Sequence, residues 1–106
     1  MKNTFEVILC IVNTGFSEVA MDAAKKMGAR GGTVMSGRGT ASKESEKFYN
    51  ITIQPEKEIV MILVASEIKD NVLKGLYDAV GMDTSAQGIA FSLPVDGVVG
   101  IGSNKK

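Results

Sequence analysis

Two runs of apolar and largely β-branched residues limit most strongly how this chain can fold. They span residues 5–12 (FEVILCIV) and 58–65 (EIVMILVA). A continuous apolar run of this length predicts a strand in the middle of a sheet, because such a strand is covered on both faces. The chain has 106 residues, which is enough for one core. We therefore expect a single domain over residues 1–106, with the two runs as central strands of one sheet.

A segment with helical spacing of apolar residues follows each run. Apolar residues recur three and four positions apart over residues 16–27, with Ser17 as the expected N-cap and Gly28 as the helix end. The second helix follows Ser66, its expected cap, and ends at Gly81. Both halves of the chain thus begin with a strand and a helix.

Weaker strands complete the halves at residues 31–36 and 88–95. The polar, glycine-punctuated segment 37–54 lies between the halves and has no clear periodicity. A segment of this length in so small a domain predicts a flexible functional loop rather than a plain connector. Residues 98–101 (VVGI) are expected to add a short strand against a neighbouring subunit.

The predicted order of elements is strand, helix, strand, long loop, strand, helix, strand. This βαββαβ order predicts an α+β protein with the ferredoxin-like fold, a four-stranded antiparallel sheet with two helices on one face. The other face has no helix to cover it, although its strands are apolar. Association with copies of the same chain would bury that face, so we expect an oligomer.

Charge and residue usage exclude several classes of function. Twelve Lys and Arg residues balance 12 Asp and Glu residues, and the zero formal charge argues against a nucleic-acid partner. The absence of histidine removes the commonest general base and zinc ligand, so we expect neither an enzyme nor a metal site. Cys10 lies within an apolar run and is expected to be buried and inert. A start unlike a signal peptide, and no apolar run of roughly 18 residues, favour a cytoplasmic protein.

Several local stretches, in this order along the chain, resemble the PII family of signalling proteins. They are residues 27–34 (MGARGGTV), 37–40 (GRGT), 55–59 (PEKEI) and 88–91 (GIAF). The first is similar to the family's passage from helix one to strand two, and the second to the base of its long loop. The third lies where the family's strand three begins, and the fourth where its second loop ends. The resemblance covers most of the chain.

The resemblance implies a homotrimer with clefts between neighbouring subunits that bind an adenine nucleotide or another small ligand. ATP, ADP or AMP would act there as a regulatory ligand, with no obligatory cofactor. Glycines let backbone amides approach a phosphate, and a threonine hydroxyl can bond a base edge or a ribose. The ligand-binding residues implied in this way are Gly31, Gly32, Thr33, Gly37, Arg38, Gly39, Thr40, Lys57 and Gly88.

The resemblance also implies that the loop docks on a partner protein, such as a membrane transporter or a regulatory or metabolic enzyme. A ligand that orders the loop changes what the loop can bind, and nitrogen regulation is the family's usual role. The expected partner-docking residues are Lys43, Glu44, Glu46, Lys47, Phe48 and Tyr49. Tyr49 lacks the flanking residues of the family's modified tyrosine, so uridylylation is not expected.

The chain departs from the family where the family neutralises polyphosphate. Residues 83–88 (DTSAQG) hold no lysine, and residues 96–101 (DGVVGI) hold no arginine. This departure favours a less charged nucleotide, or another small ligand, over a triphosphate. It also keeps open a trimeric stress or assembly protein similar to the CutA group, which has the same fold and binds no nucleotide.

Two further functions fit the predicted fold less well. An acyl-phosphate hydrolase needs an arginine cradle and a positioned asparagine, and Arg38 with Asn50 does not make that set. RNA binding on an open sheet needs aromatic residues on the central strands, and residues 58–65 contain none.

Overall fold

The structure is a computed structural model that describes residues 4–40 and 56–100. A strand-and-helix unit occurs in each half of the chain, as the sequence predicts. In chain order the elements are β1 (Phe5–Asn13), α1 (Ser17–Lys26), β2 (Thr33–Arg38), β3 (Glu56–Ala65), the 3-10 turn η1 (Ser66–Ile68), α3 (Lys69–Val80) and β4 (Ile89–Pro94).

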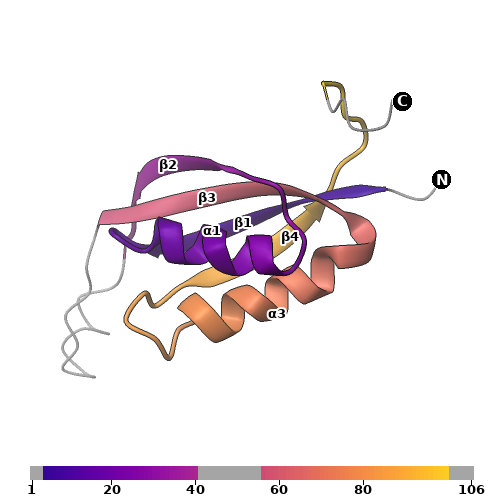
Figure 1. Cartoon of the computed structure of the whole chain (residues 1–106). Helices are drawn as coiled ribbons and strands as arrows, with labels where there is room; N and C mark the ends of the chain where they lie inside the picture. The colour runs from indigo at the N-terminus through magenta and orange to yellow at the C-terminus, as the bar shows by residue number, and fades with distance from the viewer. Residues whose placement is uncertain (1–3, 41–55, 101–106) are drawn as a thin grey trace.

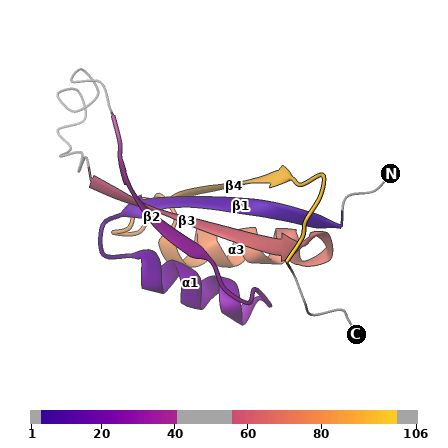
Figure 2. The ribbon, with the colours of Figure 1, turned by 90° about the horizontal axis from the view of Figure 1, so that it is seen from above.

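The strands form one sheet in the order β2-β3-β1-β4, and every neighbouring pair is antiparallel. The two apolar runs of the sequence thus become the central strands β3 and β1. Both helices lie on the same face of this sheet (Figures 1 and 2). The predicted ferredoxin-like fold is confirmed, and its strand order follows from two crossing strand-helix-strand units.

The core lies between the helices and one face of the sheet. Alternate residues of β1 (Ile8, Cys10 and Val12) are fully buried there, since successive side chains of a strand point to opposite faces. Val60 and Ile62 of β3 join them, and the helices contribute Ala20, Ala24, Val72, Leu76 and Val80. Full burial of each large aliphatic side chain stabilises the fold by about 1.5–3 kcal/mol.

The remaining residues of the central strands form an apolar face that no helix covers, here called the open face. The register places Leu9 of β1 between Met61 of β3 and Phe91 of β4. By the same register, the open face consists of Val7, Leu9, Ile11, Met35, Ile59, Met61, Leu63, Ile89, Phe91 and Leu93. Its β4 residues are 42–51% exposed in a single subunit. A contiguous apolar surface of this kind marks an interaction face.

The bounds of β2 and β3 differ from the prediction by two residues, and those of β1 and β4 by one. β2 begins at Thr33 rather than Gly31 and continues through Arg38, while β3 begins at Glu56 rather than Glu58. The reason is that Gly37 pairs with Lys57 and Arg38 with Glu56, so the ladder extends two rungs beyond the apolar residues. Polar side chains at the end of a strand do not prevent backbone pairing, and a hydrophobic pattern misses such residues.

The caps at the starts of the helices were predicted wrongly, whereas the helix ends were predicted correctly. Ser17 is the first residue of α1, and Glu58 Oε1 accepts hydrogen bonds from the backbone amides of Gly15 and Ser17 at 3.1 and 3.2 Å. Ser66 begins the 3-10 turn, and α3 starts only at Lys69. Gly28 ends α1 with a φ of 111°, a left-handed conformation that favours glycine, and Gly81 ends α3.

Residues 98–100 lie outside the sheet, so the described part of the predicted last strand does not pair within the subunit. Over residues 4–40 and 56–100, neither helix has the length and apolar character needed to cross a membrane.

Candidate functional site

The predicted ligand-binding residues lie at two opposite ends of the sheet. The end at Asn13, Arg38, Glu56 and Ile89 is here called the loop end, and the end at Phe5, Thr33, Ala65 and Pro94 the far end. The antiparallel register groups the strand termini in this way, because β1 and β2 finish where β3 and β4 start.

Most of the predicted residues lie at the loop end. Gly37, Arg38, Gly39 and Thr40 stand at and beyond the end of β2, and Lys57 pairs directly with Gly37. A Cβ atom on Gly39 would come within 2.8 Å of Lys57 Cε, so the lysine side chain runs alongside this glycine.

Gly31, Gly32 and Thr33 lie at the far end, where β2 begins. Thr33 and Arg38 are the two termini of one extended strand, and at about 3.3 Å per residue they are about 17 Å apart. A single subunit therefore does not assemble the predicted residues into one site.

A hollow of about 580 Å³ lies at the far end beside these residues. It is formed by the chain that leaves α1, the start of β1, and the end of β3 with the 3-10 turn. Arg30 and Glu67 line it together with apolar side chains such as Phe5 and Leu63. The far end thus offers a concave surface next to Gly31.

A hydrogen-bonded cluster at the loop end joins three parts of the chain. Lys57 Nζ donates to Asn13 Oδ1 at 2.7 Å, and Asn13 Nδ2 donates to Ser85 O at 3.1 Å and to Gln87 Oε1 at 3.4 Å. The backbone amide of Asn13 also donates to Ala86 O at 2.9 Å. We call Asn13, Lys57, Ser85 and Gln87 the Asn13 network; it fixes the loop before β4 to the ends of β1 and β3.

Asn13 was not predicted as a site residue, and neither was Gln87. Within the described ranges, Asn13 is the buried polar residue, with 5% of its surface exposed. One feature of the sequence could have identified it. An asparagine that directly ends a buried apolar strand needs hydrogen-bond partners, because buried polar groups are nearly always paired.

The described part of the loop end carries few charges, and its two basic groups are outnumbered by the carboxylates Glu56, Glu58 and Asp83. Of the two basic groups in its described part, Lys57 is bound to Asn13, and Arg38 lies opposite Glu56 in the ladder. The loop before β4 adds no cation, and Asp83 is exposed on it. This end therefore lacks the charge to neutralise a triphosphate.

Backbone packing requires glycine at two of the predicted positions. A Cβ atom on Gly88 would collide with Val80 O, and one on Gly32 would lie 2.7 Å from Met61 O. These glycines permit the close approach of two backbone segments, as expected for glycine in or beside a strand. Gly31, by contrast, faces open space. The partner-docking residues Lys43, Glu44, Glu46, Lys47, Phe48 and Tyr49 all lie outside the described residues.

The fold and the loop end together define a ferredoxin-like domain with an apolar open face and a polar cluster at the base of its long connection. No family model matches the chain, and no curated protein matches it either. Solved structures do. The crystal structure of Arabidopsis thaliana PII bound to citrate is 21% identical, with a TM-score of 0.71 over 98% of this chain and 86% of that one.

Two other solved structures show the same likeness. A PII-like signalling protein of Thermus thermophilus is 17% identical, with a TM-score of 0.65 over 90% of each chain. A Bacillus cereus protein related to NIF3 is 14% identical, with a TM-score of 0.69; the match covers 90% of this chain but only 26% of that protein. This chain therefore has the PII-like fold, and the resemblance found in its sequence is confirmed at the level of the fold.

Proposed function

We propose that this chain is a cytoplasmic PII-like regulatory protein that senses a small ligand in clefts between the subunits of a homotrimer. The main support for a shared cleft is that the candidate ligand residues lie at opposite ends of β2, about 17 Å apart along an extended strand. A complete site therefore needs the loop end of one subunit and the far end of another. The sensor consists of one domain and does not act as an enzyme.

The open face supports association of the subunits. It crosses all of the strands and consists of aliphatic side chains, methionines and Phe91. Burying it between copies removes apolar surface from water at about 25 cal/mol for each Å². The likeness to PII structures favours a trimer among the closed assemblies.

The charges favour a ligand of low negative charge. Lys57 and Arg38 provide cations for one phosphate or carboxylate group, and the hydroxyl of Thr33 in the neighbouring subunit would bond a base edge or a ribose. Among adenine nucleotides, AMP and ADP fit this set better than ATP. The Arabidopsis PII structure is bound to citrate, so a carboxylate ligand is compatible with this fold.

The output of the sensor is a change in the connection between β2 and β3. This connection starts and ends at the loop end, beside Gly39 and Lys57, so a ligand bound there acts at its base. We propose that it docks on a partner protein, such as a membrane transporter or a metabolic enzyme.

Two observations favour a second candidate function. Gly32 and Gly88 are accounted for by backbone packing, and residues 83–88 supply no cation. Both facts fit a CutA-like trimeric stress or assembly protein that binds no nucleotide.

Calorimetric titration with ATP, ADP, AMP and cyclic nucleotides, with the mass in solution measured alongside, tests the proposal. The sharpest form uses the exposed residues Thr33 and Arg38, one at each end. Thr33→Ala and Arg38→Ala should each abolish binding, whereas Lys26→Ala, an exposed residue of α1, should not.

Mixing the two defective proteins and allowing the subunits to exchange should restore part of the binding, because some clefts then receive two intact ends. A trimer that binds none of these nucleotides would refute nucleotide sensing and favour the second candidate. Binding that survives in a monomer would refute the shared cleft.

A further inference from the structure

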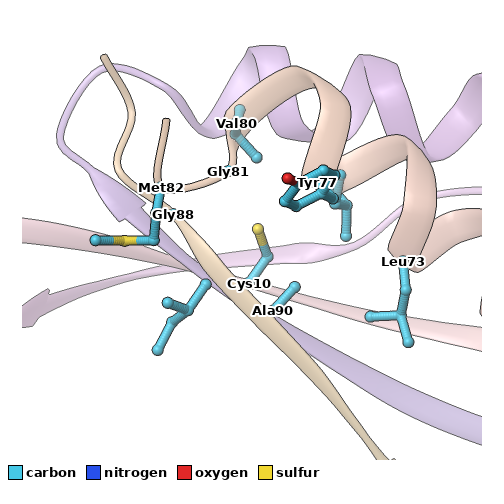
Figure 3. A pocket seen from close by; sticks show the side chains of 10 residues that line it. Cys10, Leu73, Tyr77, Val80, Gly81, Met82, Gly88 and Ala90 are labelled. Atoms are coloured by element: carbon cyan, nitrogen blue, oxygen red, sulfur yellow. The ribbon is translucent and has the colours of Figure 1, made fainter. Parts of the chain in front are cut away.

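A pocket of about 330 Å³ lies between the C-terminal half of α3 and the edge strand β4, on the helix-covered face of the sheet (Figure 3). Leu73, Leu76, Tyr77 and Val80 of α3 form one wall. Gly81, Met82 and Gly88 of the following loop close one end, and Cys10, Ile89 and Ala90 come from the sheet. The pocket adjoins the open face, with which it shares Ile89, and Gly88 is the one predicted ligand residue that borders it.

The described side chains that line the pocket include no Lys, Arg, Asp or Glu. Its ionisable groups are the Tyr77 phenol and the Cys10 thiol, and burial raises the pKa of the Cys10 thiol to about 11, so the thiol is neutral at pH 7. An anion that entered would lose its hydration without gaining an opposite charge. The pocket thus lacks cations such as Lys57 and Arg38 among its lining residues, and it suits a neutral occupant.

The rim of the pocket exposes large apolar groups that a ligand would cover. Tyr77 and Met82 are 65% and 59% exposed, although one lies on α3 and the other on the loop that follows it, and both line this pocket. Below them, Cys10, Leu76 and Val80 are buried almost completely. Figure 3 shows Tyr77 on the helix above the pocket, with Cys10 and Ala90 on the strands below. The Tyr77 hydroxyl provides a hydrogen-bonding group at the edge of an apolar surface.

Tight turns fix the end wall of the pocket before any ligand binds. Gly88 N donates to Val80 O at 2.7 Å, and Gly81 N donates to Tyr77 O at 3.1 Å. Thr84 Oγ1 donates to Gly81 O at 2.8 Å and accepts from Ala86 N at 3.2 Å. Because this wall is already ordered, less conformational entropy is lost when a ligand binds.

We propose that this pocket binds a small, neutral and largely apolar molecule, with one polar group directed at the Tyr77 hydroxyl. The volume lies at the lower end of the range for small-molecule sites, about 300–1,000 Å³. The pocket is a second site, which shares Gly88 with the proposed cleft between subunits.

Indole is a suitable probe, because it is neutral, flat and carries one hydrogen-bond donor. Protein labelled with ¹³C at the methionine methyl groups allows titration by NMR. Met82 reports on the pocket, whereas Met35 and Met61 on the open face serve as internal controls. The Met82 signal should shift saturably while the signals of Met35 and Met61 stay in place.

Two variants keep Met82 as the reporter while they change the pocket. Ala90→Leu fills the floor, and Tyr77→Lys places a charge on the exposed rim without disturbing the core. Each should weaken the apparent affinity for indole at least about tenfold, since even partial loss of the apolar contact removes about 1.4 kcal/mol. Val19→Lys, an equally drastic change at an exposed position of α1, should leave the affinity unchanged.

Several results would overturn the proposal. They are a Met82 signal that stays still up to the solubility limit of indole, methionine signals that all shift in parallel, and an affinity that survives both pocket variants. Protection of the free protein's Met82 methyl from a soluble paramagnetic probe would show that a second copy covers the pocket, and would also overturn it.

Discussion

Removing the Asn13 side chain should destabilise the protein far more than its single amide group suggests. Asn13→Ala abolishes the bonds to Lys57 Nζ, Ser85 O and Gln87 Oε1 at a position that is 5% exposed. A neutral hydrogen bond contributes about 1 kcal/mol and one to a charged group about 1.5–3 kcal/mol. In the variant, water partly replaces Asn13 as the hydrogen-bond partner of Lys57 and Gln87. The free energy of unfolding should therefore fall by about 2–3 kcal/mol, less than the sum of the three bonds.

Urea denaturation followed by circular dichroism measures this loss, at one fixed protein concentration because an oligomer's stability depends on concentration. Asn71→Ala is the matched control, since it is the same substitution at an exposed position of α3. It should change the free energy of unfolding by no more than about 0.5 kcal/mol.

A double-mutant cycle isolates the contact between Asn13 and Lys57. If their bond carries the effect, Asn13→Ala and Lys57→Met should be non-additive by about 1 kcal/mol or more. An Asn13→Ala protein no less stable than the Asn71→Ala control would refute the network as a structural element. Full additivity would refute the bond to Lys57 as its main part.

Three other perturbations have definite expected outcomes. Leu9→Glu places a charge at the centre of the open face and should dissociate the oligomer in sedimentation experiments, whereas Val19→Glu on α1 should leave its mass unchanged; equal masses would contradict the proposed interface. Glu58→Gln weakens the cap of α1 and should lower the free energy of unfolding by about 1 kcal/mol in thermal melts. An unchanged free energy of unfolding would show that water satisfies these amides equally well and would contradict the role of the carboxylate. Burial raises the pKa of Cys10 from 9.0 to about 11, so the thiol stays protonated to a higher pH in the folded form than in the unfolded form. The neutral thiol therefore contributes fully to the free energy of unfolding below pH 9, and this contribution is lost as the pH rises to about 11. Over that range the free energy of unfolding of the natural protein should fall by up to about 2–3 kcal/mol more than that of Cys10→Ala. An equal fall in the two proteins would contradict this expectation.

The parts of the fold that follow from local chemistry were predictable from the sequence. The apolar runs at residues 5–12 and 58–65 became central strands, and Gly28 and Gly81 ended the helices. The caps were not predictable in this way. The group that caps α1 is Glu58, 41 and 43 residues away from the amides it accepts from, and only the packing of β3 beside α1 brings it there.

The arrangement of the candidate site residues could not be predicted from the sequence, for a geometric reason. Gly31–Thr33 and Gly37–Thr40 are neighbours in the sequence, but the extended strand between them holds the two groups far apart. Asn13 depends on partners 72 and 74 residues away, which no local pattern indicates. Gly32 and Gly88 were predicted to lie close to a ligand or to another backbone segment. In the structure each lies against the backbone of another segment.

The split of the candidate residues between the two ends of the sheet has a consequence for mixtures of intact and damaged subunits. In the proposed trimer, each subunit would contribute its loop end to one cleft and its far end to the next. One subunit damaged at both ends would therefore inactivate two of the clefts in a trimer. A minority of such subunits would thus abolish more ligand binding than their share of the mixture, which is a dominant-negative effect. Mass action adds a second effect, because a ligand that bridges two subunits favours the assembled ring, and dilution of the protein competes with the ligand.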